Sequence, residues 1–172
     1  MNIRNFEFKA RVADLETYEN KLLQLKPRFK GEDHQIDTYF EVPKGRLKLR
    51  EGNIENALIN YNRENTADSK LSEVILYKHQ SSKALKDILI LQFGIKIVVD
   101  KRRRIYFIDN VKFHFDVVEG LGTFIEVEAI DDSDRYTTEA LKEQCDHYYR
   151  YFGLTPSQLI DKSYSDLMEM IR

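Results

Sequence analysis

The stretch Arg46–Arg50, with the sequence RLKLR, decides how the fold is interpreted. Successive side chains of a β-strand point to opposite faces, so a strand here carries three cations on one face and two leucines on the other. The leucines need a covering helix, and the cations must then find their partners on the opposite face.

Three further stretches separate charged from apolar side chains in the same way. Thr123–Ala129 places two carboxylates opposite two branched aliphatic residues, while Asn2–Arg11 and Val111–Val117 alternate phenylalanines with charged residues. The charged faces of these stretches carry Glu7, Lys9, Lys112, His114, Asp116, Glu126 and Glu128. If helices cover the apolar faces, the charged faces must point into the interior of a barrel.

Hydrophobic periodicity and turn residues predict eight strands and four helices along the chain. The predicted strands are Asn2–Arg11, Ile36–Phe40, Arg46–Arg50, Ala57–Arg63, Leu71–His79, Ile95–Phe107, Val111–Val117 and Thr123–Ala129. The predicted helices are Leu15–Leu25, a helix capped by Ser81 or Ser82 that ends near Phe93, Thr137–Phe152 and Ser157–Ile171. No linker, repeat or low-complexity stretch divides the chain, so we expect a single domain over residues 1–172.

Composition indicates a soluble globular protein, with 42% apolar and 33% charged residues. No apolar run approaches the roughly 20 residues that span a bilayer, and Met1–Arg11 lacks the features of a secretory signal. The single cysteine, Cys145, cannot form an internal disulfide. The formal net charge of −2 gives no overall basic field, so we expect no binding to nucleic acid. Because the chain shows neither a spanning segment nor a signal, we expect a cytoplasmic protein that does not bind a membrane.

The predicted interior contains more cations than its own acids can neutralise. The acids counted are Glu7, Asp116, Glu126 and Glu128, and the cations are Lys9, Arg46, Lys48, Arg50, Arg63, Lys101 and Arg103. Because an unpaired buried charge is very costly, the excess cations predict a polyanionic ligand. Carboxylates suit Mg²⁺ or Mn²⁺, and arginine and lysine bind phosphate oxygens. The two sets together predict a metal–triphosphate complex of a small molecule.

A simpler alternative is an open sheet with helices on one face and a solvated charged face on the other, an arrangement common in α+β proteins. For Lys101–Arg104, alternation alone does not decide which two of the four cations point inward. His114 shares its face with Asp116, where it could act as a general base or as a hydrogen-bonded structural residue; we favour the structural role.

Taken together, four stretches resemble the CYTH superfamily, the triphosphate-tunnel enzymes that include class IV adenylyl cyclases, thiamine triphosphatases and inorganic triphosphatases. The matching stretches are Glu7–Lys9 from the family's ExExK motif, Gln35–Phe40, Gly45–Arg50 and Leu121–Glu128. The resemblance covers nearly the whole chain. It implies an α+β fold, a closed eight-stranded antiparallel β-barrel with helices packed on its outside, and it is consistent with a homodimer.

The resemblance also implies roles for individual residues. Glu7, Glu126 and Glu128 would hold the divalent metal, with Asp116 as a further ligand or a partner of substrate or water. The residues that would bind phosphate are Lys9, Arg46, Lys48, Arg50, Arg63, Lys101 and Arg103, with weaker support for Lys78 and Lys162. The predicted catalytic set is Glu7, Lys9, Asp116, Glu126 and Glu128.

The chain departs from the family motif at Asn5, where the first glutamate of ExExK is replaced by a neutral amide. The Asp37–Phe40 and Gly45–Glu51 stretches resemble the class IV cyclase-like branch, which does not establish cyclase activity. Three functions therefore stay open: hydrolysis of a triphosphate with Mg²⁺ or Mn²⁺, which we favour; cyclisation of ATP to cyclic AMP and pyrophosphate; and binding of polyphosphate or nucleotide without turnover.

Overall fold

A closed antiparallel barrel forms the body of the molecule in the computed structural model, which describes residues 2–62 and 70–172, with only the backbone of Asn2 and Lys70. Its strands are β1 (Asn2–Arg11), β2 (Arg28–Phe40), β3 (Arg46–Glu51), β4 (Ala57–Asn62), β5 (Lys70–Lys78), β6 (Ile95–Ile108), β7 (Val111–Val118) and β8 (Gly122–Asp131). Around the barrel their order is β1-β5-β4-β3-β2-β6-β7-β8, and every pairing is antiparallel. The predicted fold is confirmed, and the open-sheet alternative is wrong.

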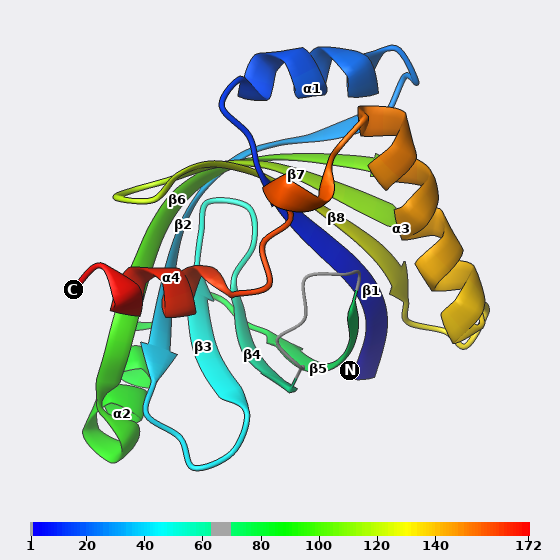
Figure 1. Ribbon diagram of the computed structural model, residues 1–172. Coiled ribbons are helices and arrows are strands. Elements are labelled where there is room, and N and C mark those ends of the chain that lie inside the picture. Colours follow the sequence, from blue (N-terminus) through cyan, green and yellow to red (C-terminus); the bar gives the residue numbers. More distant parts are fainter. Residues whose placement is uncertain (1, 63–69) are drawn as a thin grey trace.

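The helices lie outside the ring of strands, as Figure 1 shows. They are α1 (Leu15–Leu23), α2 (Lys83–Phe93), α3 (Thr138–Phe152) and α4 (Tyr164–Met170), with a short 3-10 turn at Pro156–Gln158. Side-chain caps start α1 and α3: Asp14 accepts a hydrogen bond from the Thr17 amide, and Thr137 accepts one from the Ala140 amide. Among the described residues, no helix is both long and apolar enough to cross a bilayer.

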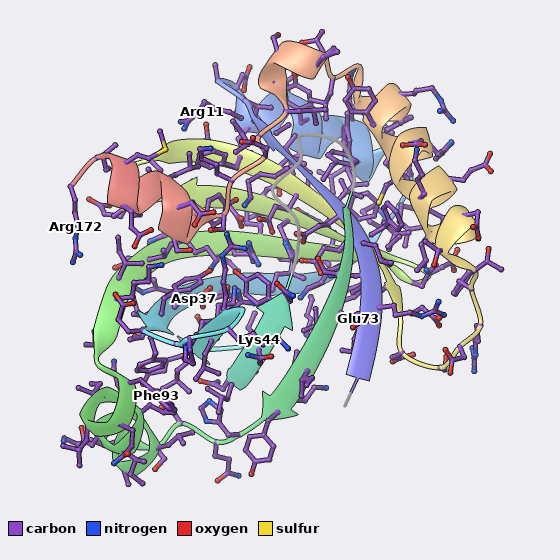
Figure 2. The ribbon with its side chains drawn as sticks, turned by 60° about the horizontal axis from the view of Figure 1, so that its bottom comes forward. Arg11, Asp37, Lys44, Glu73, Phe93 and Arg172 are labelled. Atoms are coloured by element: carbon purple, nitrogen blue, oxygen red, sulfur yellow. The ribbon has the colours of Figure 1, made fainter. Side chains whose placement is uncertain are left out.

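The apolar outer faces of the strands pack against these helices. The main core joins β1, β7 and β8 to α1 and α3, with Phe8, Phe113 and Val127 packed against Leu22 and Phe152. A smaller core places the leucines of β3 under α2. Since burial of apolar surface stabilises by about 25 cal/mol per Å², these outer contacts favour the strand orientation that turns the charged faces inward. In Figure 2, Asp37 lies within the ring of strands and Phe93 lies outside it.

The prediction was wrong at two places. β2 begins at Arg28, eight residues before the predicted start. The sequence did not reveal its first half, because Phe29 is the one apolar side chain between Arg28 and Gln35 and the pairing with β6 shifts register between Phe29 and Gly31. The predicted helix Ser157–Ile171 is instead the 3-10 turn and α4, separated by an extended segment whose Ile160 amide donates to the Lys9 carbonyl. This segment brings Tyr164 into the end of the barrel. The end of the predicted strand at Arg63 lies outside the described residues.

Candidate functional site

The barrel encloses a cavity of about 750 Å³. Eight of the predicted site residues line it: Glu7, Lys9, Lys48, Arg50, Lys101, Arg103, Glu126 and Glu128. Lys78 also lines it, whereas the Lys162 ammonium lies 3.8 Å from Asp161 and its side chain is 38% exposed. Arg46 and Asp116 are not among the described residues that line this cavity, and Arg63 lies outside the described residues.

Register explains which cations of β6 point inward. Lys101 pairs with Gln35, and Arg103 pairs with Asp116, so both side chains face the interior and both are 2% exposed. Arg102 is exposed on the outer face. The ambiguity of the sequence at this strand is therefore resolved by its pairing with β2 and β7.

Asp37 on β2 is the centre of a group of three cations. Its carboxylate lies 2.7 Å from the Lys101 ammonium, 2.8 Å from the Arg50 guanidinium and 3.2 Å from the Lys48 ammonium. Burial would raise the pKa of Asp37, but Arg50, Lys101 and Lys48 hold it well below its usual value. One carboxylate cannot neutralise three cations. Burial and the neighbouring arginines lower the pKa of Lys101 to about 7, against the opposing effect of Asp37.

Arg103 is fixed by two carboxylates. Its guanidinium donates hydrogen bonds of 2.7 and 2.6 Å to the two oxygens of Asp116 and a third of 3.1 Å to Glu126. The Tyr164 hydroxyl donates a 2.7 Å hydrogen bond to Asp116. Since Asp116 is fully buried behind Arg103, this geometry suits it to orienting the arginine rather than to contacting a ligand.

Lys9 and Arg46 both contact residues of α4. The Lys9 ammonium is 3.1 Å from Glu126 and 3.9 Å from the centre of the Tyr164 ring, so α4 contributes directly to the environment of a predicted phosphate ligand. Arg46 forms a 2.8 Å ion pair with Asp166 of α4. This pair ties α4 to β3 and places the Arg46 guanidinium at the rim.

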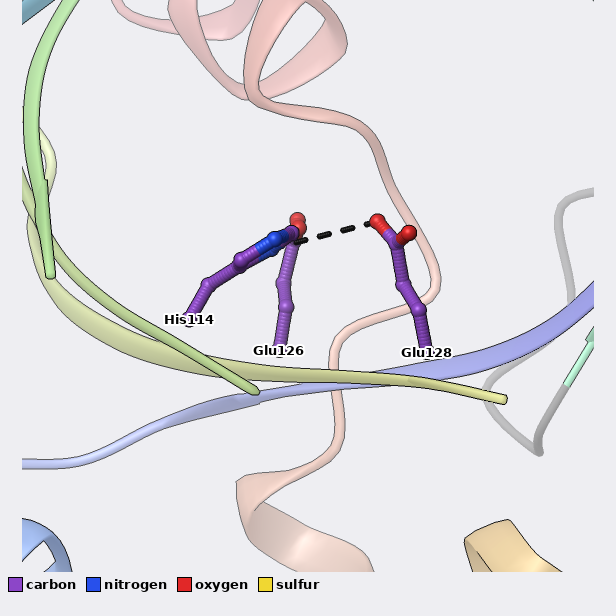
Figure 3. A group of neighbouring side chains, drawn as sticks. All are labelled: His114, Glu126 and Glu128. Carbon is purple, nitrogen blue, oxygen red and sulfur yellow. Dashed lines mark hydrogen bonds and ion pairs between the residues drawn. The ribbon is translucent and has the colours of Figure 1, made fainter. Parts of the chain in front are cut away.

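Three side chains of β7 and β8 come together on one face of the sheet, as Figure 3 shows: His114, Glu126 and Glu128. The His114 Nδ1 atom is 3.1 Å from Glu126 and 3.8 Å from Glu128. Ligand atoms of the three residues all lie within 4.8 Å of one another. On the neighbouring strand, Glu7 pairs in register with Glu128.

The two glutamates of β8 have opposite electrostatic environments. Burial would raise the pKa of Glu126, but Lys9 and Arg103 hold it well below its usual value. Burial and the adjacent Glu7 raise the pKa of Glu128 to about 7. A divalent cation would relieve the repulsion between Glu7 and Glu128, and hard carboxylate oxygens suit Mg²⁺ or Mn²⁺, so the donor set fits such an ion.

His114 is poorly suited to act as a base. It is 1% exposed, and burial together with Arg103 and Lys112 lowers its pKa to about 3, so the imidazole is neutral near pH 7. Its contact with Glu126 orients the carboxylate that Lys9 and Arg103 also contact. These observations favour the structural role expected for this histidine.

Glu55, in the loop between β3 and β4, projects into the cavity and was missed by the sequence interpretation. It lies 2.5 Å from the Lys112 ammonium and 3.2 Å from the Arg50 guanidinium. The loop is held by Asp33, a fully buried carboxylate that accepts 2.9 Å hydrogen bonds from the amides of Ile54 and Glu55. The count of interior charges from sequence was therefore incomplete.

Other missed residues carried different amounts of sequence signal. Alternation placed Lys112 on an inward-facing strand face, but Lys112 was left out of the count of interior cations. Asp37 stands on a predicted strand but was not assigned to the site. Glu55 and Tyr164 had no comparable signal, because a loop has no periodicity and the start of α4 was assigned to the middle of a longer helix.

Uncharged side chains of β1, β4 and β5 form one part of the cavity surface, between Glu7 of β1 and Lys78 of β5. We call this surface the neutral wall, and it consists of Ile3, Asn5, Ile59, Ser72, Val74 and Leu76. Three register pairs assemble it: Ile3 with Val74, Asn5 with Ser72, and Ile59 with Leu76. The charged wall consists of the ionisable cavity-lining residues on β1, β3, β6, β7 and β8 described above, together with Glu55.

Solved structures of similar shape share this architecture. The PH1012 protein from Pyrococcus horikoshii OT3 is 28% identical, with a TM-score of 0.82 over 95% of this chain and 98% of that one. A putative adenylate cyclase from Vibrio parahaemolyticus is 18% identical, with a TM-score of 0.77 over 96% of this chain and 97% of that one. The putative adenylyl cyclase HpAC1 from Hippeastrum, described as having a dominant triphosphatase activity, is 12% identical, with a TM-score of 0.67 over 100% of this chain and 97% of that one.

Comparison of the amino-acid sequence with known proteins agrees with the comparison of structures. Adenylate cyclase CyaB from Aeromonas hydrophila is 25% identical over 174 aligned residues, which cover 95% of this chain and 87% of that protein. The family model for the CYTH domain matches residues 4–160, which include all but the first two residues of β1, the whole of β2 to β8, and the charged wall. The chain therefore belongs to the CYTH family, whose triphosphate-tunnel proteins include adenylate cyclases and triphosphatases.

Proposed function

We propose that this protein hydrolyses a triphosphate with the help of Mg²⁺ or Mn²⁺. The observation that supports this most strongly is the charged wall, where cations of β3 and β6 and carboxylates of β1 and β8 line one cavity. Phosphate oxygens need the first group and a divalent metal needs the second. The cavity thus offers complementary partners for both parts of a metal–triphosphate complex.

The roles of the residues follow from their positions. Lys9, Lys48, Arg50, Lys101 and Arg103 bind the phosphate oxygens. Asp116 and Tyr164 hold Arg103 and Lys9 in orientation. Glu7 and Glu128, supported by Glu126, would hold the metal, which when bound supplies positive charge to the phosphate oxygens. Water attacks the terminal phosphorus, the bond to the bridging oxygen breaks, and orthophosphate and the diphosphate leave.

A second candidate is an adenylyl cyclase, favoured by the likeness to CyaB of Aeromonas hydrophila over 95% of this chain. In that reaction the ribose 3′-hydroxyl attacks the α-phosphorus of ATP and pyrophosphate leaves. The same phosphate and metal ligands serve both reactions, so the position of the nucleophile distinguishes them.

Chromatography of the products tests these alternatives. The purified protein is incubated with ATP, thiamine triphosphate or tripolyphosphate, each with Mg²⁺ or Mn²⁺. Orthophosphate as the main product supports the triphosphatase, and cyclic AMP with pyrophosphate supports the cyclase. Binding without any product would favour a non-catalytic triphosphate-binding module, the third function left open by Asn5.

Substitution of the glutamates tests the metal site. Glu126→Gln and Glu128→Gln should each reduce turnover by about 100-fold or more, because metal-assisted charge stabilisation supplies several kcal/mol. Glu73→Gln, on the exposed outer face of β5, is the matched control and should keep wild-type turnover. Wild-type rates in both cavity variants would refute the assignment of the site.

A further inference from the structure

Glu55 places a negative charge among the cations of the cavity. Its carboxylate lies 2.5 Å from the Lys112 ammonium and 3.2 Å from the Arg50 guanidinium, and it accepts a 3.2 Å hydrogen bond from the side-chain amide of Gln35. Burial would raise the pKa of Glu55, but Lys112 and Arg50 hold it well below its usual value. The side chain is therefore an anion at neutral pH, in the cavity that the proposed function assigns to a bound anion.

The loop that carries Glu55 is anchored through both its backbone and its side chain. The buried Asp33 carboxylate accepts hydrogen bonds from the amides of Ile54 and Glu55, and Gln35 donates to Asp33 at 2.8 Å as well as to Glu55. Gly52 lies so close to this anchor that a Cβ atom there would be 2.6 Å from Asp33 Oδ1. A bound phosphate chain must therefore accommodate the Glu55 carboxylate rather than displace it.

Glu55 stands at one end of the cations that bind phosphate. Along β3 the inward-facing Lys48 is followed by Arg50, and Glu55 comes in the loop after the strand. Lys112, on the same side, is already paired with Glu55. At the opposite end, where β3 begins, α4 and the ring of Tyr164 lie against the cavity. The phosphate site is thus bounded by α4 at one end and by a carboxylate at the other.

A phosphate group placed beside Glu55 would be repelled. The Glu55 side chain is 17% exposed, so water screens the repulsion between two anions there only weakly. Arg50 offers little compensation, because its Nε and one Nη atom donate to Asp37 while its other Nη atom donates to Glu55. An uncharged group in the same place would meet no such repulsion.

We propose that Glu55 closes the phosphate site on the side of Lys112, and thereby makes the protein discriminate against linear polyphosphates longer than a triphosphate. This inference rests on the proposed function and adds to it the residue that limits the length of the phosphate chain. The phosphates of a triphosphate meet the cations between α4 and Arg50. A fourth phosphate would have to lie beside the Glu55 carboxylate.

Calorimetric titration of the folded protein with tripolyphosphate and tetrapolyphosphate tests the proposal, in EDTA so that no metal-dependent turnover occurs. The wild-type protein should bind tetrapolyphosphate no more tightly than tripolyphosphate, although the longer chain carries more negative charge. Glu55→Gln should tighten the binding of tetrapolyphosphate about tenfold and that of tripolyphosphate by at most about threefold, because only the longer chain lies beside the charge that is removed.

Glu51→Gln is the matched control, since Glu51 ends the same strand but pairs at 2.7 Å with Lys86 of α2, outside the barrel; it should change neither affinity. Gly52→Ala is a second test, because it keeps every charge but places a Cβ atom against the Asp33 carboxylate that holds the loop. Displacement of the loop should also reduce the discrimination between the two chains.

Two results would overturn the inference while leaving the proposed function intact. One is tighter binding of tetrapolyphosphate than of tripolyphosphate by the wild-type protein. The other is an equal gain for both chains in Glu55→Gln, which would make Glu55 a general counter-ion of the cavity. Failure of both chains to bind, with EDTA and with Mg²⁺, would overturn the proposed function itself, and this inference with it.

Discussion

The two walls of the cavity are built by the same alternation of strand residues, but they meet their chemical needs in different ways. Most side chains of the charged wall contact a partner on another strand, as Arg103 contacts Asp116 and Glu126. In the neutral wall, the polar atoms of Asn5 and Ser72 have no such partner among the described residues. The charged wall is thus held in position by contacts within the chain, whereas two polar atoms of the neutral wall have no such contact among the described residues.

Within the charged wall, one region has an excess of positive charge and another has an excess of negative charge. Around Asp37 there are too many cations, and the pKa of Lys101 falls to about 7 through burial and its cationic neighbours. Around Glu7 there are too many carboxylates, and the pKa of Glu128 rises to about 7 through burial and the adjacent Glu7. A polyanion bound at the first region and a cation bound at the second would satisfy both. The local imbalance of charge is thus complementary to a metal–triphosphate complex.

The largest change in unfolding free energy is expected from Asp37→Asn, which removes a carboxylate that contacts cations of the charged wall. This change leaves Lys48, Arg50 and Lys101 buried without their shared carboxylate, and breaking a buried ion pair in this way costs about 3–5 kcal/mol. Urea unfolding monitored by circular dichroism measures the loss. Tripolyphosphate should restore more stability to the variant than to the wild-type protein, because it replaces the missing negative charge.

Asp134→Asn is the matched control for that change. Asp134 also pairs with an arginine, Arg4, but its side chain is 95% exposed, and such surface pairs contribute about 0–1 kcal/mol. Equal losses in the two variants would show that the buried carboxylate has no special role in holding the cations.

The next largest effect is expected from Lys101→Met, which should change how stability depends on pH. The groups around this ammonium are Asp37, Lys48, Arg50, Arg103 and the Tyr164 ring. Because its pKa is lower in the folded state than in the unfolded chain, the unfolded chain binds more protons above pH 7. This residue therefore makes wild-type stability rise between about pH 7 and 10, by about 2 kcal/mol from pH 7 to 9.

Urea unfolding at pH 7 and pH 9 measures this contribution as the difference between the two proteins. The variant should lack the rise, and its stability relative to wild type should be greatest at the lower pH. Replacement of Arg102, exposed on the outer face of β6, by Met should leave the pH dependence unchanged. An identical rise in Lys101→Met would mean that another group titrates.

A smaller effect is expected from Tyr164→Phe at the edge of the charged wall. The change removes the 2.7 Å hydrogen bond to the buried Asp116 carboxylate, worth about 1.5 kcal/mol of unfolding free energy, but keeps the aromatic ring near Lys9. Tyr77→Phe, with a side chain 66% exposed outside β5, should leave stability unchanged. If the two variants were equally stable, Asp116 would depend on Arg103 alone.

The sequence predicted the barrel because its strands separate charge from apolar surface with a period of two, and burial of the apolar face then fixes the orientation of the whole strand. That reasoning placed Lys48 and Arg50 on the cavity side and Leu49 in the core. It failed in the first half of β2, where Phe29 is the one apolar residue of Arg28–Gln35 and no alternation of charged and apolar residues is present.

The candidate site was predicted less completely than the fold. Alternation gives the face of a side chain but not its depth, so it did not separate Asp116 and Arg46, which are not among the described residues that line the cavity, from the predicted residues that do line it. Glu55 reaches the cavity from a loop that is held by a hydrogen bond from the Glu55 amide to the Asp33 carboxylate. The two residues are 22 positions apart in the chain, so no local sequence pattern reveals this contact. The pairing of Asn5 with Ser72 required the closure of the barrel between β1 and β5.

The smallest effect is expected from two buried serines, one in the neutral wall and one in α4. Ser72 and Ser165 are each 3% exposed. The Ser165 hydroxyl lies 2.7 Å from the Ser163 hydroxyl, whereas the Ser72 hydroxyl has no hydrogen-bond partner among the residues that the structure describes. Ser165→Ala should lower the unfolding free energy by about 1 kcal/mol, whereas Ser72→Ala should leave it unchanged or raise it by up to about 1 kcal/mol, because the lost hydroxyl is unsatisfied. Urea unfolding without ligand compares them. Equal losses would mean that the Ser72 hydroxyl is already paired in the free protein, and the contrast between the two walls would not hold at this position.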